Sequence, residues 1–331
     1  MSAATGAASE RARLLDAIRE APAFCLTTHE RPDGDAVGSL AAMQQVLTRL
    51  GKDAVAFLAP DEFPLPYEYR FIRLDGLVTT PPDDLADRVL VFLDCGNIDR
   101  TPADVLKRDG GRILNIDHHH DNTRFGTINH VDPAASCTAE IVWDLMLALG
   151  VEPDESIGEA LYVGLVTDTG RFMYENTGPR AHEMAAALLR WGVDAHGIYR
   201  RLYEGVPQGK LDLLARALSG VQRYDGGLLT LTHLTREDYR STGADESYSE
   251  GVVDHLRSVE GTAVAGLVRD VLAANGKPRK VSLRATDDRV DVSAIARAGG
   301  GGGHRRAAGF STDLEFADVV EFLRDKLAEQ L

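Results

Sequence analysis

The feature that most restricts the fold of this chain is the order of its apolar segments. Residues 23–29 and 53–59 are short apolar runs, and residues 35–51 between them repeat apolar side chains at helical spacing. A strand, a helix and a second strand in this order form a parallel pair joined by a crossover helix. Further apolar runs at 89–94 and 112–117 continue the pattern. The sequence therefore predicts an α/β fold with a parallel sheet flanked by helices.

The chain is also long enough for two domains, since its 331 residues exceed the usual size of a single hydrophobic core. The stretch 193–222 is interpreted as a helical linker, with one helix from 197 to about 220. Beyond it the strand and helix patterns restart. Residues 1–192 and 223–331 are therefore predicted to be two domains, the second a smaller α/β domain.

The composition limits the partners of the chain. With a formal net charge of −15, it gains nothing from counterion release along a long DNA duplex, so long duplex DNA is not an expected partner. Carboxylates gathered in one place can still hold metal cations, which attract a phosphate to an acidic protein. The three cysteines show no CxxC pattern, and no run is apolar enough to span a membrane. We expect a cytoplasmic protein without a membrane partner.

One imidazole and two carboxylates crowd the turn after the first strand. His29, Asp33 and Asp35 stand close together in the sequence, and the helix begins beside them. Carboxylates brought this close repel each other unless they are protonated or bridged by a cation, so the crowding favours a metal site. The alternative is that both aspartates cap the helix and that His29 lies beside them incidentally.

Three further segments place His and Asp side chains where apolar runs end. Asp94, the pair His118 and His119, and Asp168 each follow such a run. Ligand sites of parallel sheets lie at the carboxyl ends of the strands, so we expect these side chains to converge with the first cluster. Singly, each has a simpler interpretation as a turn residue, a solvated loop or a helix cap. Together they favour one shared site.

Five segments resemble the motifs of a known family. Four are similar to the motifs of the DHH phosphoesterase superfamily, and the fifth is similar to the glycine–histidine motif of its DHHA1 domain. The segments are HERPDGDAVGS, VFLDCGN, IDHHH, GLVTDTGRF and GGGGGHRRAAGF. The residues of these motifs most resemble those of the bifunctional nanoRNase and pAp-phosphatase group. The resemblance implies a DHH catalytic domain over 1–192 and a DHHA1 substrate-binding domain over 223–331.

The resemblance also implies two divalent cations and assigns their ligands. The ligands of the first cation would be His29, Asp33 and Asp94. Those of the second would be Asp35, Asp94, His118 and Asp168, so that Asp94 bridges the two. Oxygen and imidazole ligands suit Mn²⁺, with Mg²⁺, Co²⁺ or Zn²⁺ as substitutes. The cation pair would activate a water for attack on phosphorus.

His119 is assigned to the substrate phosphate, to which it would donate a hydrogen bond as negative charge builds up. The alternative is that it orients His118, because ligating imidazoles usually need such support. His120 has no counterpart role in the family motif and is interpreted as solvated. Cys95, beside Asp94, is interpreted as a small buried thiol.

The glycine run 299–303 is predicted to form a flexible backbone concavity whose amides approach a phosphate closely. The alternative is a flexible hinge followed by solvated arginines. Arg284 also resembles a substrate-facing position of the family. The substrate-binding residues assigned in this domain are Arg284, Gly302, Gly303, His304, Arg305 and Arg306.

The expected substrates are very short RNA, linear dinucleotides and 3′-phosphoadenosine-5′-phosphate (pAp). The first alternative is a cyclic dinucleotide phosphodiesterase of the c-di-AMP type, which would use the same chemistry. A RecJ-like single-strand exonuclease should carry basic segments that this acidic chain lacks. A family II pyrophosphatase has a second domain without the segment GGGGGHRRAAGF. A non-catalytic nucleotide or metal sensor would not need an open two-metal site. A homodimer is a family expectation.

Overall fold

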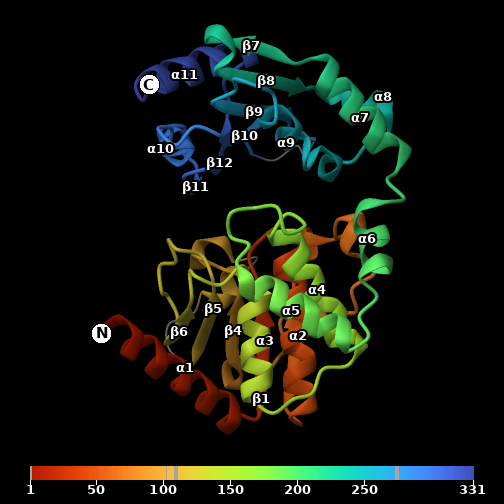
Figure 1. Ribbon diagram of the computed structural model, residues 1–331, viewed down its shortest axis with the longest axis vertical. Coiled ribbons are helices and arrows are strands. Elements are labelled where there is room, and N and C mark those ends of the chain that lie inside the picture. Colours follow the sequence, from red (N-terminus) through yellow and green to blue (C-terminus); the bar gives the residue numbers. More distant parts are fainter. Residues whose placement is uncertain (1, 102, 108–110, 273–275) are drawn as a thin grey trace. The chain divides into compact units, whose positions relative to one another are not determined.

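The chain folds into two compact units. A computed structural model describes residues 2–101, 103–107, 111–272 and 276–331, without the side chains of residues 2–8 and 304. The first unit spans Met1–Glu204 and the second spans Gly205–Leu331. Each unit has its own sheet and its own hydrophobic core (Figure 1).

The boundary between the units falls inside the predicted linker 193–222. Helix α6 (Ala195–Tyr203) belongs to the first unit and helix α7 (Gln208–Ser219) to the second. The single helix predicted over 197–220 is therefore wrong. Pro207 directly precedes α7, and a proline disfavours helical backbone at the residue before it, which separates the two helices.

The first unit contains a parallel sheet, which confirms the predicted fold class. Within the described residues it has six strands in the order β3-β2-β1-β4-β5-β6, and every neighbouring pair is parallel. The strands are β1 (Ala23–Thr27), β2 (Asp53–Phe57), β3 (Leu77–Val78), β4 (Val89–Leu93), β5 (Ile113–Asp117) and β6 (Ile128–Val131). Besides α6, the helices are α1 (Ser2–Glu20), α2 (Gly34–Arg49), α3 (Thr138–Ala148), α4 (Glu155–Asp168) and α5 (Pro179–Arg190).

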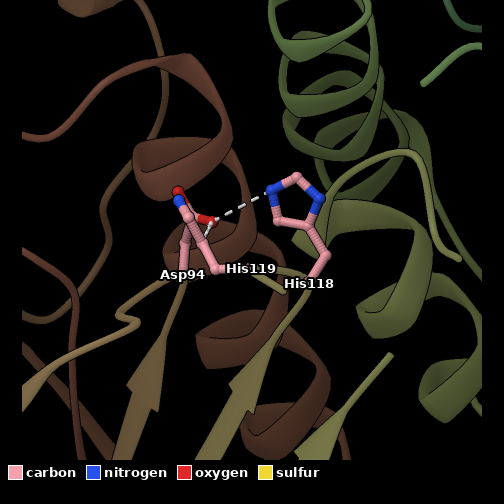
Figure 2. A group of neighbouring side chains, drawn as sticks. All are labelled: Asp94, His118 and His119. Carbon is pink, nitrogen blue, oxygen red and sulfur yellow. Dashed lines mark ion pairs between the residues drawn. The ribbon is translucent and has the colours of Figure 1, made fainter. Parts of the chain in front are cut away.

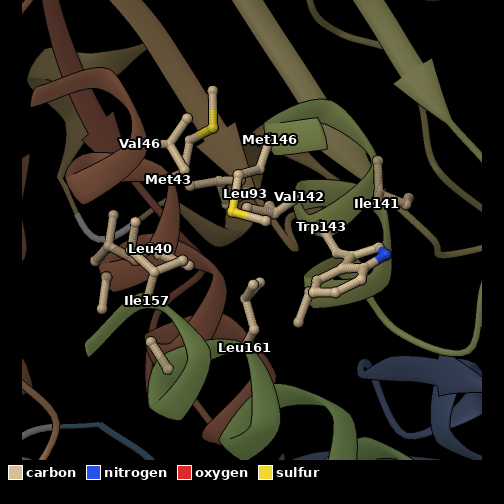
Figure 3. Close-up of a cluster of buried hydrophobic side chains, with 14 of the residues drawn as sticks. Leu40, Met43, Val46, Leu93, Ile141, Val142, Trp143, Met146, Ile157 and Leu161 are labelled. Carbon is tan, nitrogen blue, oxygen red and sulfur yellow. The ribbon is translucent and has the colours of Figure 1, made fainter. Parts of the chain in front are cut away.

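The two faces of this sheet are covered differently. On one face, buried side chains of α1 to α4 pack against strand residues such as Leu26 and Leu93. Figure 3 shows part of this core, with Leu40 and Met43 of α2 and Leu161 of α4 among its labelled side chains. The opposite face is covered by short 3-10 segments and loops, which include Leu85 and Leu106. Successive strand residues point to opposite faces, so each strand contributes to both layers.

Helices α2 and α4 pack unusually closely because glycines line their contact. We call Gly34, Gly38 and Gly164 the glycine seam. A Cβ at Gly38 would lie 2.4 Å from the carbonyl oxygen of Ala160, and one at Gly164 would lie 2.7 Å from Oδ1 of Asp35. Real Cβ atoms do not approach other atoms this closely, so the seam is what allows α2 and α4 to meet at this distance.

The second unit contains a mixed sheet in the order β11-β12-β10-β9-β8-β7, counted over the part of the chain that is described. Strands β8 and β9 are parallel, and the other pairs are antiparallel. Helices α10 and α11 cover one face, and α7, α8 and α9 cover the other. The strands are β7 (Gln222–Tyr224), β8 (Leu229–Leu234), β9 (Val264–Asp270), β10 (Arg279–Ala285), β11 (Gly302–His304) and β12 (Ala307–Thr312). The remaining helices are α8 (Arg236–Thr242), α9 (Val252–Arg257), α10 (Val292–Ala298) and α11 (Phe316–Ala328).

The glycine run 299–303 differs from its prediction. Gly302 and Gly303 do not form a flexible concavity but lie in β11, paired with Gly309 and Ala308 of β12. A Cβ at Gly303 would lie 2.6 Å from Cα of Ala308. Glycine therefore allows the two strands to approach each other closely, and the end of the run is held by strand pairing.

Candidate metal centre

The predicted ligands of the first unit gather at the carboxyl end of its sheet. His29 follows β1, Asp94 directly follows β4, and His118 and His119 follow β5. Asp168 differs from the strand-end pattern, because it is the last residue of helix α4. The apolar run before Asp168 is thus helical, and α4 reaches the same place by packing on α2 along the glycine seam.

Three overlapping groups of possible metal ligands result. In each group, one ligand atom per residue lies within 4.8 Å of the others. The groups are Asp94 with His118 and His119, Asp33 with His29 and Asp94, and Asp35 with His118 and Asp168. Nε2 of His118 lies 3.7 Å from Oδ1 of Asp94 and 3.6 Å from Oδ2 of Asp168. All six predicted metal ligands are therefore brought together by the fold.

Asp94 occupies the centre of this cluster. Its carboxylate oxygens lie 3.6 Å from Nε2 of His29 and 3.6 Å from Nδ1 of His119, and Figure 2 shows the ring of His118 facing it. Thr138 fixes the carboxylate from α3 through a hydroxyl hydrogen bond of 3.0 Å. The backbone of Asp94 is left-handed, with φ of 55°, which costs roughly 1 kcal/mol outside glycine. Strained backbone of this kind is typical of functional sites.

The two aspartates of the first cluster have different surroundings. Asp33 is the N-cap of α2, and its Oδ1 accepts hydrogen bonds of 3.1 Å from the amides of Asp35 and Ala36. The capping alternative is therefore correct for Asp33, although its carboxylate also lies in a ligand group. Asp35 is buried, and its carboxylate accepts the amides of Thr138 and Ala139 at 2.6 and 2.9 Å. The N-terminus of α3 thus orients Asp35.

The charges of the centre are unbalanced without a cation. Burial, followed by the nearby carboxylates of Asp94 and Asp168, raises the pKa of Asp35 well above its usual range. Burial likewise raises the pKa of Asp168 to about 7. Burial would also raise the pKa of Asp94, but the hydrogen bond with His29 and the two nearby imidazoles outweigh it and lower that pKa. Divalent cations would neutralise this crowding, so the oxygen and imidazole donors fit such ions.

His119 is held by a carboxylate that sequence reasoning did not assign. Asp117 is fully buried, and its Oδ1 lies 2.7 Å from Nδ1 of His119. Burial lowers the pKa of His119, but this hydrogen bond and the charge of Asp94 raise it to about 10. The rings of His118 and His119 meet edge to face at 4.9 Å. Cys95 is a buried thiol, as expected, and burial raises its pKa to about 12.

The predicted substrate-binding residues of the second unit lie on two strands and the turn between β11 and β12. Arg284 is on β10, and its Nε lies 3.6 Å from a carboxylate oxygen of Asp254. Arg305 donates to the carbonyl oxygen of Asp288, and Arg306 pairs with the Asp288 carboxylate. Gly302 and Gly303 are in β11. The side chain of His304 lies outside the described residues.

Two further residues of the first unit support the centre and were not predicted. Thr138 is the first residue of α3, and its hydroxyl bonds to Asp94 instead of capping the helix. Asn176 donates through Nδ2 to the carbonyl oxygens of Ser136 and Asp168, at 2.8 and 3.1 Å, and to Oδ2 of Asp168 at 3.2 Å. Nothing in the sequence around Asn176 indicates this role, because the contact joins a loop to a helix end.

Replacing Asn176 with leucine should weaken Mn²⁺ binding about 10- to 100-fold, the usual effect of removing a residue that orients a metal ligand. Without the amide, Asp168 loses the donor that fixes its carboxylate. Isothermal titration of the purified variant with Mn²⁺ measures the change directly. The matched control is Asn129→Leu, since within the described residues the side chain of Asn129 bonds only to the backbone of Gly126, in the turn before β6. Equal losses of affinity in both variants would contradict a specific role for Asn176.

Comparison with known proteins agrees with this geometry. The DHH family N-terminal domain matches residues 23–165, and the DHHA1 domain matches residues 232–331. The chain therefore belongs to the DHH family of phosphoesterases, which are metal-dependent hydrolases acting on phosphate esters. Within the described residues, no helix has the length and apolar character that crossing a membrane requires.

Relatives extend over nearly the whole chain. The bifunctional oligoribonuclease and PAP phosphatase NrnA of Thermus thermophilus is 35% identical over 322 residues, 96% of this chain and 93% of the relative. The protein of the same name from Bacillus subtilis is 23% identical over 91% of this chain and 93% of its own. An exopolyphosphatase-related protein from Bacteroides fragilis has the same fold, with a TM-score of 0.86, 24% identity and coverage of 97% and 96%.

Proposed function

We propose that this chain hydrolyses short oligoribonucleotides, linear dinucleotides and pAp by two-metal activation of water. The observation that carries the proposal is the convergence of the six predicted His and Asp ligands on overlapping ligand groups, two of which share Asp94 and two of which share His118. The substrate class is supported by the similarity to the Thermus protein, whose name gives oligoribonucleotides and PAP as substrates. The acidic net charge of −15 agrees with a small substrate better than with a long polymer.

The proposed cofactor is a pair of divalent cations, with Mn²⁺ the expected ion. His29, Asp33 and Asp94 would hold one, and Asp35, Asp94, His118 and Asp168 the other. When bound, such a pair lowers the pKa of a water and stabilises the charge on the phosphoryl oxygens. We also propose that the protein acts in the cytoplasm, as its cysteine pattern suggests, and that it forms a homodimer, as its family resemblance implies.

The side chains of the protein would position these groups. Thr138 and the first amides of α3 hold the carboxylates of Asp94 and Asp35 in place. His119, whose pKa is raised to about 10 beside Asp117, is suited to donate a hydrogen bond to a phosphate oxygen. In the second unit, Arg284, Arg305 and Arg306, with Gly302, Gly303 and His304, would bind the substrate.

The test is a substrate panel with the purified protein and Mn²⁺. We expect phosphate release from pAp and cleavage of dinucleotides and very short RNA, with much slower cleavage of long RNA. Chelation of the metal should abolish all of these activities. Cleavage of cyclic dinucleotides without cleavage of pAp would instead favour the cyclic dinucleotide phosphodiesterase. Binding of pAp without any turnover would favour a sensor.

A further inference from the structure

The loop after Asp168 presents large apolar and aromatic side chains to solvent. Met173 is 82% exposed and Tyr174 is 43% exposed. The loop connects α4, which ends in Asp168, to α5. Exposed apolar side chains grouped beside a polar centre often mark a ligand-binding surface.

The position of Tyr174 is fixed relative to the metal centre. Its amide donates to the carbonyl oxygen of Thr169 at 3.0 Å. Its ring lies against Gly170, where a Cβ would come within 2.4 Å of the ring carbons. Gly170 also has a left-handed φ of 54°, which glycine adopts without strain. Two residues farther along, Asn176 bonds to the Asp168 carboxylate, so both ends of this short loop are tied to the ligand.

A cation and further aromatic rings lie beside the same loop. The guanidinium carbon of Arg171 lies 5.1 Å from the ring centre of Tyr203. The ring of Tyr199, which is 42% exposed, lies 5.2 Å from that of Tyr203. Aromatic and guanidinium groups in one place are the chemistry that proteins use to stack nucleobases.

We propose that Met173 and Tyr174 form a stacking surface for the nucleobase of a nucleotide whose phosphate lies at the metal centre. This inference rests on the proposed function, because it assumes a nucleotide substrate. Stacking depends on the flat face that all bases share, so the surface would accept different bases. It would favour nucleotides over phosphate esters that lack a base.

The test compares equilibrium binding of AMP and ribose 5-phosphate to the Mn²⁺-loaded full chain by isothermal titration. We expect AMP to bind the wild-type protein about tenfold more tightly, which is within the range of one stacked base. Tyr174→Leu should remove most of this preference and leave the affinity for ribose 5-phosphate unchanged. Tyr174→Phe keeps the ring and should keep the preference.

The outcomes are distinct. Equal binding of the two ligands by the wild-type protein would overturn the inference, as would an unchanged preference in Tyr174→Leu. A parallel loss of affinity for both ligands in that variant would also overturn it, since it would indicate general damage to the site. Turnover of pAp, measured separately, tests the proposed function. If the protein prefers AMP but does not cleave pAp, the proposed hydrolysis of pAp is wrong, while the proposed stacking surface still stands.

Discussion

Asp94→Asn should lower kcat for pAp and for dinucleotides by roughly a thousandfold. The asparagine keeps the shape of the side chain and the hydrogen bond from Thr138. It removes the negative charge that the imidazoles of His29, His118 and His119 surround. One residue that belongs to two ligand groups affects both proposed cation positions at once. Initial rates with saturating Mn²⁺, together with the number of Mn²⁺ ions bound in isothermal titration, measure the effect.

The matched control is Asp75→Asn, because Asp75 is an exposed carboxylate of the same unit that pairs with Arg73 at 3.0 Å. Its removal should change kcat by less than about twofold, since exposed ion pairs contribute little. Full activity of the Asp94 variant, or normal Mn²⁺ stoichiometry in it, would show that Asp94 does not bridge the two ions.

Gly38→Val should reduce the free energy of unfolding by about 3 kcal/mol, the cost of placing extra atoms in a packed core. Its Cβ would lie 2.4 Å from the carbonyl oxygen of Ala160, so α2 and α4 must move apart. Because α2 carries Asp35 and α4 carries Asp168, we expect Mn²⁺ affinity to fall as well. Urea unfolding of the metal-free protein and titration with Mn²⁺ measure the two effects separately.

The matched control is Thr48→Val, which places the same β-branched side chain at an exposed position of α2. This variant should unfold within about 0.5 kcal/mol of the wild-type protein. Unfolding of Gly38→Val at the same urea concentration as this control would contradict the role of the glycine seam in helix packing.

The sequence allowed the first sheet and most of the centre to be predicted because both follow local patterns. Apolar runs identify β1, β4 and β5, and polar residues directly after them fall at one sheet edge. Asp168 was placed on the correct edge for a different reason than expected, since a short apolar run does not distinguish a buried helix from a strand. Asn176 acts through a contact between a loop and a helix end, for which a single sequence holds no local signal. Asp117 ends β5 and is only two residues from His119, but the sequence does not show that its carboxylate turns toward that ring.

The second unit was less predictable in detail. Its strand positions follow apolar runs, but the glycine run 299–303 was predicted as a flexible concavity and not as part of a strand. In the fold, Gly303 permits close pairing with β12 instead. Glycine can provide either a flexible segment or a close approach between two backbones, and the presence of a paired strand distinguishes these two roles.

The first turn of α3 has a consequence for how the centre keeps its dimensions. This turn binds Asp35 through two amides and Asp94 through the hydroxyl of Thr138, yet in the described chain α3 belongs to none of the ligand groups. It therefore acts as a spacer that sets how far apart two carboxylates from different elements stand. Any tilt of α3 would move both carboxylates together, so the reactive geometry depends on a helix that contributes no ligand.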